Sequence, residues 1–150
     1  MELVFEFVLR ARLEPPLPFG GGLLGERMFF NAFDGEVEGE RLNGKLLPGG
    51  GDWLIAHPSG WGVLDVRTQI RTDDGALIFV HYPGLIEMRP ATLDALKNGT
   101  ATRIEDQYFR TTPRFETGNA RYAWLNQSLF VGAGRIIEGI GVEYRVHRVT

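Results

Sequence analysis

Residues 61–82, WGVLDVRTQIRTDDGALIFVHY, carry the clearest secondary-structure signal of the chain. Polar and apolar residues alternate along Trp61–Arg71, and a second extended segment runs through Ala76–Tyr82. A period of two is typical of a β-strand with one face on the core and the other in solvent. The intervening Thr72–Gly75 suits a tight turn, because its glycine can adopt the positive φ that such a turn needs. The stretch therefore predicts a long antiparallel hairpin.

Further strand signals, separated by turn residues, occur along the rest of the chain. They cover residues 3–11, 26–33, 37–42, 52–57, 107–112, 121–131 and 135–148. Residues 90–97 form the one good helix candidate, because proline suits the first helical turn and Gly99 can cap the end. Regularly spaced strands without βαβ units favour an all-β fold. We predict one domain over residues 1–150: a single antiparallel up-and-down β-barrel of about eight strands, with one short helix.

Composition excludes several classes of protein. The 150 residues are 43% hydrophobic and 23% charged, which is typical of a folded globular domain. A formal net charge of −3 gives no sign of a nucleic-acid or membrane-surface partner. Cysteine is absent, so neither a disulfide nor a thiol nucleophile is available. Because Glu2 and Glu6 interrupt the apolar N-terminal residues, we expect no signal peptide, no membrane span and a cytoplasmic location.

Motifs for cofactors are weak. Residues 20–25 match the glycine pattern of dinucleotide sites, but prolines precede them and an extended segment follows, so we expect a mobile loop at the barrel mouth. The histidines, His57, His81 and His147, lack the spacing of metal ligands. The Gly-x-Ser-x-Gly pattern of a nucleophile elbow is also missing. We therefore expect no metal and no other cofactor.

A polar strand face at residues 65–71 is open to two interpretations. Asp65, Arg67, Gln69 and Arg71 share one side of the expected strand. Periodicity favours an ordinary solvated outer face against an apolar core. The alternative is a polar lining of the barrel interior, in which Arg67 would bind an anionic or carbonyl oxygen of a ligand.

Residues 108–130 are richest in aromatic and ionisable side chains. Tyr108 and Arg110 share one face of an expected strand, and Tyr122, Trp124 and Asn126 share a face of the next. Aromatic rings with an amide and a phenol make a suitable wall for a small organic ligand. The competing interpretation is that the rings fill the core and their polar tips bind the backbone, since buried Tyr and Trp need such partners anyway.

Several motifs occur in an order that resembles a known family. The first motif is Gly44-x-Leu46-x-Pro48-Gly49-Gly50-x-Asp52-Trp53. After it come Asp65-x-Arg67, residues 72–76 and residues 108–117 (YFRTTPRFET). The last motif is Tyr122-x-Trp124-Leu125-Asn126. The order is similar to that of the domain of unknown function family 3237, also called uncharacterised protein family 0311, and the resemblance covers nearly the whole chain. It implies a small calycin-like barrel similar to allene oxide cyclases and dirigent proteins. The matching positions are Asp52, Trp53, Arg67, Asp74, Arg110, Glu116, Tyr122 and Trp124.

The resemblance and the residues together favour a cofactor-free enzyme of isomerase, cyclase or lyase type acting on a small oxygenated organic substrate. Asp52 and Glu116 are the candidates for general acid or base, because a carboxyl group among aromatic rings has a raised pKa. Arg67 or Arg110 would stabilise a developing oxyanion. The candidate substrate-binding residues are Trp53, Tyr108, Tyr122, Trp124 and Asn126.

Two other functions remain open at this point. The barrel would also serve as a non-catalytic ligand-binding or dirigent-like protein, or as a structural homodimer that uses an exposed barrel face. An ionisable group inside the barrel favours the enzyme, an entirely apolar lining favours a carrier, and a completely filled barrel favours the structural role.

Overall fold

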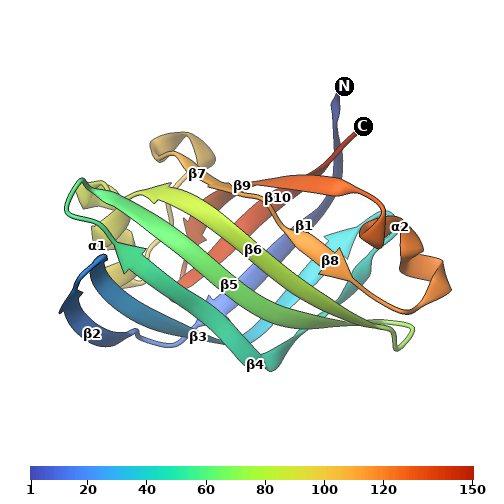
Figure 1. Ribbon diagram of the computed structural model, residues 1–150, viewed down its shortest axis with the longest axis horizontal. Coiled ribbons are helices and arrows are strands. Elements are labelled where there is room, and N and C mark those ends of the chain that lie inside the picture. Colours follow the sequence, from blue (N-terminus) through green and yellow to red (C-terminus); the bar gives the residue numbers. More distant parts are fainter.

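The computed structural model describes all residues from Met1 to Thr150 and is dominated by β-strands (Figure 1). The ten strands are β1 (Leu3–Leu13), β2 (Leu17–Gly22), β3 (Gly25–Gly39), β4 (Asn43–Ala56), β5 (Trp61–Thr72), β6 (Leu77–Glu87), β7 (Phe109–Thr111), β8 (Arg114–Glu116), β9 (Leu129–Ile137) and β10 (Gly141–Val149). The two helices are α1 (Pro90–Asn98) and α2 (Ala123–Asn126), and single 3₁₀ turns cover Ile104–Asp106 and Ala120–Tyr122. Neither helix has the length and apolar composition needed to cross a lipid bilayer.

The sheet closes on itself. Its order is β1-β10-β9-β7-β6-β5-β4-β3, and β1 also pairs with β3, which completes a barrel of eight strand positions. β8 pairs with β6 beyond the end of β7, so these two short strands together occupy one position. All pairings are antiparallel, and most join strands that follow one another along the chain. The exceptions are β1 with β3 and with β10, β6 with β8, and β7 with β9. The predicted up-and-down barrel is confirmed.

β5 explains how the sequence produces the barrel wall. Burial alternates strictly along the strand, with Leu64, Val66 and Ile70 inside and the charged residues outside. The turn after it places Gly75 at φ 89°, a conformation that costs glycine little. The polar face at residues 65–71 is therefore outer surface, and the alternative that it lines the interior is wrong. Burying the branched aliphatic side chains requires this orientation, because a strand cannot turn both faces inward.

Several segments differ from the expected secondary structure. The separate strands expected over residues 26–33 and 37–42 form one strand, β3, and the strand expected over residues 52–57 begins already at Asn43 as β4. The predicted strand over residues 121–131 is wrong, since the 3₁₀ turn and α2 occupy its first half and β9 begins only at Leu129. The Asn119 side chain accepts a hydrogen bond from the Arg121 N–H at 3.0 Å and so caps the helical turn. The glycine-rich residues expected to form a loop instead make the hairpin β2–β3, which extends from the barrel wall. α1 begins at the expected Pro90 and ends against Gly99 at φ 68°.

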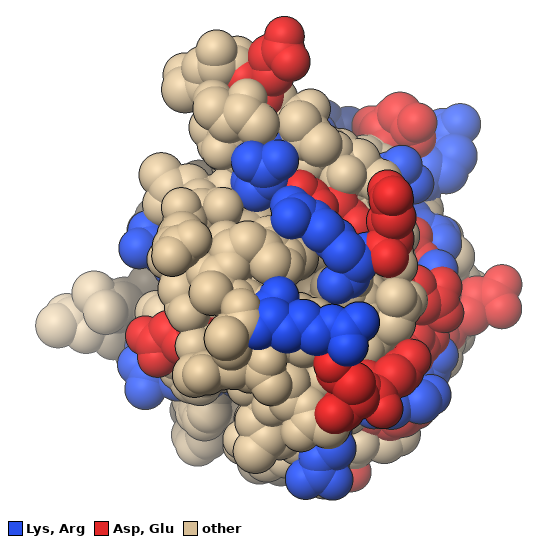
Figure 2. Space-filling view, turned by 90° about the vertical axis from the view of Figure 1, so that its right-hand side faces the viewer, with Lys and Arg blue, Asp and Glu red and all other residues tan.

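The two ends of the barrel are covered by different helices (Figure 1). The α2 end is filled by aromatic rings: Phe7 and Phe115 lie 5.5 Å apart, and Phe115 and Phe130 lie 5.1 Å apart between ring centroids. Seen from this end, acidic and basic side chains lie next to one another beside a broad area of uncharged residues (Figure 2). The other end is closed by α1, whose Thr92 and Ala95 are buried against the barrel.

Candidate functional site

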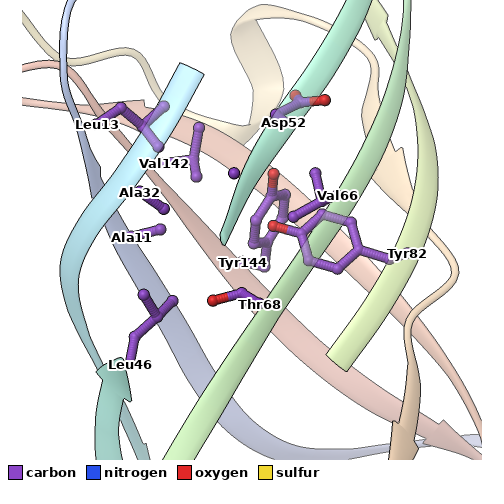
Figure 3. A pocket seen from close by; sticks show the side chains of 11 residues that line it. Ala11, Leu13, Ala32, Leu46, Asp52, Val66, Thr68, Tyr82, Val142 and Tyr144 are labelled. Carbon is purple, nitrogen blue, oxygen red and sulfur yellow. The ribbon is translucent and has the colours of Figure 1, made fainter. Parts of the chain in front are cut away.

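Two small cavities lie inside the barrel, toward its α1 end. The first cavity has a volume of about 20 Å³ and the second a volume of about 30 Å³, so each has room for one or two water molecules. The first is lined by Ala11, Leu13, Ala32, Leu46, Gly51, Asp52, Val66, Thr68, Tyr82, Val142 and Tyr144 (Figure 3). The second continues toward α1, where Met88 and Leu96 line it. Both share Leu13, Asp52 and Val142, so Asp52 stands where the two cavities meet.

Asp52 is the single charged residue among these lining residues. β4 carries it on the same inward face as Leu54, and its carboxylate accepts a hydrogen bond from the Asp65 backbone N–H at 3.1 Å. Burial raises the pKa of this carboxyl group to about 7, and the nearby Asp65 charge adds to the rise. The Asp65 N–H and the Arg27 charge oppose it. A carboxyl group that titrates near neutral pH suits proton transfer.

Two tyrosines and a threonine complete the polar lining. Tyr82 on β6 and Tyr144 on β10 are buried, with ring centroids 5.3 Å apart in an edge-to-face arrangement. Burial raises the pKa of both phenol groups above the usual value, so both keep their protons at neutral pH. The Thr68 hydroxyl is buried and has no hydrogen-bond partner in the protein. In Figure 3 the two phenol oxygens lie between the Asp52 carboxylate and the Thr68 hydroxyl.

Of the residues predicted from the sequence for catalysis, only Asp52 lies in this interior site. Arg67 and Glu116 are exposed on the outer face of the wall, on β5 and β8. Arg110 is also outside, where its guanidinium donates to the Phe109 carbonyl at 2.9 Å and lies 5.2 Å from the Tyr108 ring centroid. The alternation that buries their strand neighbours turns these side chains outward.

The predicted substrate-binding residues also lie away from the cavities. Tyr122 is buried under the α2 end, where its hydroxyl donates to Asp74 at 2.7 Å. Trp124 is stacked under the Arg41 guanidinium at 3.7 Å. The exposed Asn126 side chain hydrogen-bonds both the N–H and the carbonyl of Thr117, which holds the α2 turn against β8.

Two further aromatic candidates stand on the outside of the wall. Trp53 packs against Phe29 with 4.7 Å between ring centroids, and Tyr108 meets Trp61 edge-on at 5.7 Å. The structure therefore does not bring the predicted aromatic lining together with Asp52. The expectation that Tyr122, Trp124 and Asn126 share a strand face is wrong, because these residues belong to a helical turn.

Several proteins are similar to this chain over nearly its whole length. A UPF0311 protein of Rhodopseudomonas palustris strain TIE-1 is 36% identical over 150 residues, which is 99% of this chain and 97% of that protein. A crystal structure from Rhodopseudomonas palustris, described as a conserved protein of unknown function, has a TM-score of 0.90 at 35% identity and covers 99% of this chain and 97% of its own. A β-barrel-like protein from Acinetobacter baumannii has a TM-score of 0.84 at 31% identity, covering 99% and 96%.

Two fungal proteins are more distant. The crystal structure of an enzyme from Penicillium herquei shares the fold, with a TM-score of 0.72 at 19% identity over 99% of this chain and 94% of that one. The PR-toxin biosynthesis cluster protein 7 of Penicillium roqueforti is 28% identical over 81% of this chain and 62% of its own length. The family model described as "Protein of unknown function (DUF3237)" matches residues 1–149. This full-length match, together with the identity to the UPF0311 protein, shows that the chain belongs to the DUF3237 family.

Proposed function

We propose that this protein is a cofactor-independent acid–base enzyme, of isomerase, cyclase or lyase type, that transforms a small oxygenated organic molecule inside the barrel. One observation carries the proposal: an inward-facing carboxyl group, Asp52, stands where two cavities meet, and burial raises its pKa to about 7. Such a group is available as an acid and as a base at neutral pH, which is the requirement for moving a proton between two positions of one substrate.

The rest of the lining supports this proposal. The walls are mainly aliphatic, and the polar groups are few and hydroxylic. Ligand sites commonly combine an apolar wall with a few placed polar groups, which orient the substrate while the wall excludes water. The distant fungal enzyme shares this fold, and the fungal biosynthesis-cluster protein is related in sequence, although neither assigns a reaction to this chain.

Substrate entry requires the interior to widen. The cavities are far smaller than the roughly 300–1,000 Å³ of typical ligand sites. The second cavity borders Met88 and Leu96, whose side chains are only partly buried. Both are flexible and unbranched at Cβ, so their displacement toward solvent would open the α1 end without breaking the barrel wall.

A non-catalytic ligand-binding or dirigent-like barrel is the second candidate. The observation that favours it is the predominance of apolar side chains around both cavities, which suits retention of a hydrophobic ligand without any chemistry. The two candidates differ in what they require of Asp52. A carrier tolerates its replacement by a neutral amide, whereas the enzyme does not.

The test compares proton transfer in the wild type and in Asp52→Asn. A panel of small ketones, esters, epoxides and β-hydroxy carbonyl compounds is incubated in D₂O and followed by proton NMR for exchange and for product. We expect wild-type activity on at least one compound and a decrease of about 10²–10⁴-fold in Asp52→Asn, because the amide cannot accept the proton. Binding of the same compound should change little.

Glu116→Gln is the matched control, since it removes a carboxyl group that stands on the outer face of β8. It should retain wild-type turnover. Equal activity of Asp52→Asn and wild type would contradict the proposal, and binding without exchange or product in either protein would favour the carrier.

A further inference from the structure

We infer that the first cavity is an oxyanion-binding site, in which Tyr82, Tyr144 and Thr68 receive the oxygen of an enolisable carbonyl compound. This inference rests on the proposed function and names its substrate class. It depends on three hydroxyl groups that line one cavity together with a single carboxyl group (Figure 3). Each hydroxyl can donate a hydrogen bond, and the two phenol groups also interact with each other. Donor hydroxyl groups gathered around one small space suit a ligand atom that only accepts.

The three hydroxyl groups come from three parts of the barrel wall. Thr68 lies on β5, Tyr82 on β6 and Tyr144 on β10, and each residue is no more than 3% exposed. β6 and β10 are not neighbours in the sheet, so their rings meet across the interior. Fixed strands hold such donors in place before a ligand arrives, and this preorganisation makes an oxyanion site effective in a water-poor interior.

Thr68 provides an independent sign of a ligand. Its hydroxyl is buried in the cavity wall, and no protein atom bonds to it. Burying an unpaired hydroxyl opposes folding. The hydroxyl groups of the buried Thr72, Thr92 and Thr102, by contrast, all have hydrogen-bond partners. A ligand oxygen placed in the cavity would supply the missing partner.

The charge states fit an acceptor ligand. The buried phenols stay protonated at neutral pH, because burial raises their pKa, so they donate rather than attract protons from a ligand. No Lys or Arg lines either cavity, so the site lacks the fixed positive charge that a permanently anionic ligand would need. The lining therefore favours a neutral carbonyl group that becomes negative only during reaction.

The chemistry balances without any other reactant. The Asp52 carboxylate takes a proton from the carbon next to the carbonyl, the electron pair of that C–H bond forms a C=C bond, and the carbonyl π pair moves to oxygen. The hydrogen bonds from Tyr82 and Tyr144 stabilise the resulting enolate. The Asp52 carboxylic acid then returns the proton to a carbon of the conjugated system, and the substrate leaves as its isomer.

The shape of the interior limits the ligand further. The carbonyl oxygen occupies the first cavity, and the remainder of the molecule extends past Asp52 into the second, whose lining is aliphatic and aromatic apart from Asp52. Its walls include Phe30 and Phe109, whose flat rings suit a planar conjugated body. We therefore expect a small conjugated ketone rather than a sugar or an amino acid.

The test uses 4-nitrophenol as an enolate mimic and 4-nitrotoluene as a control of similar shape without the oxygen. In the wild type below about pH 7, where Asp52 is neutral, bound 4-nitrophenol should be ionised to a larger extent than free 4-nitrophenol, as its visible absorbance reports. This measurement needs no variant. Above about pH 7, where the wild-type carboxyl group is ionised, Asp52→Asn should strengthen phenolate binding, because it removes the opposing charge.

Tyr82→Phe and Tyr144→Phe should each weaken 4-nitrophenolate by on the order of tenfold, the size of one lost charge-assisted hydrogen bond. Binding of 4-nitrotoluene should change by less than about twofold, since the ring is kept. Tyr122→Phe is the matched control, because its buried phenol donates to Asp74 at the α2 end. It should leave both affinities unchanged.

The inference is overturned if neither compound binds, if bound 4-nitrophenol stays neutral, or if the tyrosine variants weaken both compounds equally. These outcomes are distinct from failure of the proposed function. Selective phenolate binding without Asp52-dependent turnover would preserve the oxyanion site and reject the enzyme. Turnover that depends on Asp52 but does not change in the Tyr82 and Tyr144 variants would support the enzyme and reject the oxyanion site.

Discussion

The two halves of the barrel interior are built on opposite principles. Toward α2, aromatic rings fill the space, and buried polar groups are paired: Glu6 accepts hydrogen bonds from Arg41 and Arg148. Toward α1, two cavities remain, Thr68 has no partner, and the half-buried Asp52 has no basic hydrogen-bond partner. Filled and paired interiors stabilise a fold, whereas spaces and unpaired polar groups weaken it. The contrast separates the half that holds the barrel together from the half available for a ligand.

The largest expected effect of this contrast lies in the filled half. Phe7→Ala should lower the free energy of unfolding by about 3–5 kcal/mol, because it leaves a large hole in a rigid aromatic cluster. Phe7 is fully buried and contacts both Phe115 and Phe130. Urea denaturation measures the change.

Leu13→Ala is the control in the other half, since Leu13 borders both cavities. Removal of its side chain enlarges existing space and should admit larger ligands. The division into two halves would be wrong if Phe7→Ala changed ligand affinity more than Leu13→Ala did.

The second expected effect is a pH dependence of opposite sign in the two halves. In the unfolded chain Asp52 ionises near pH 4, but in the folded protein burial holds its pKa at about 7. Its contribution to stability is therefore complete below the pKa of the unfolded chain, and it is lost as the pH rises through the pKa of the folded protein. Asp52→Asn removes that loss and should be more stable than wild type by about 2–4 kcal/mol at about pH 8.

Glu6 should show the reverse dependence. The hydrogen bond from Arg41, followed by that from Arg148, holds the pKa of this carboxyl group below its usual value against the effect of burial. Its stabilising contribution is present at neutral pH and is lost as the pH falls through the folded-state pKa. Glu6→Gln should therefore destabilise the protein at neutral pH, where Asp52→Asn stabilises it. Urea denaturation over a range of pH measures both, and equal signs would contradict the comparison.

Sequence patterns predicted the wall of the barrel better than its interior site. Strict alternation along β5 is a local signal, and it correctly indicated a strand with its polar face outside. The turn at α2 has no comparable signal, because Tyr122, Trp124 and Asn126 also alternate with apolar residues. Long-range contacts decide that region, such as the bond from the Tyr122 hydroxyl to Asp74, 48 positions earlier.

The site was predictable only in part for the same reason. Asp52 was identified through the family resemblance, and its inward position follows from the alternation around Leu54. Tyr82 and Tyr144 were missed, because each is one aromatic residue within an ordinary strand. Only closure of the sheet brings β6 and β10 to opposite sides of one cavity. A period-two pattern reports which face is buried, but it does not report which buried residues meet across the interior.

The smallest expected effect concerns two threonines within a single strand, β5. Thr68 and Thr72 are both buried on the inner face of β5, four residues apart, but only Thr72 has hydrogen-bond partners. Valine has nearly the same shape as threonine and lacks the hydroxyl group. Thr68→Val should raise the free energy of unfolding by about 1 kcal/mol, because it removes an unpaired buried hydroxyl. Thr72→Val should lower it by about 1–3 kcal/mol, because the Ala76 N–H and the Asp74 carboxylate lose a partner. Urea denaturation midpoints at one pH give both values.

The same Thr68→Val protein should bind a phenolate ligand more weakly than wild type does, so that added stability accompanies lost affinity. If the Thr68→Val protein is less stable than wild type, the wild-type Thr68 hydroxyl has a hydrogen-bond partner in solution. The polar groups of the α1 half would then be as well paired as those of the α2 half.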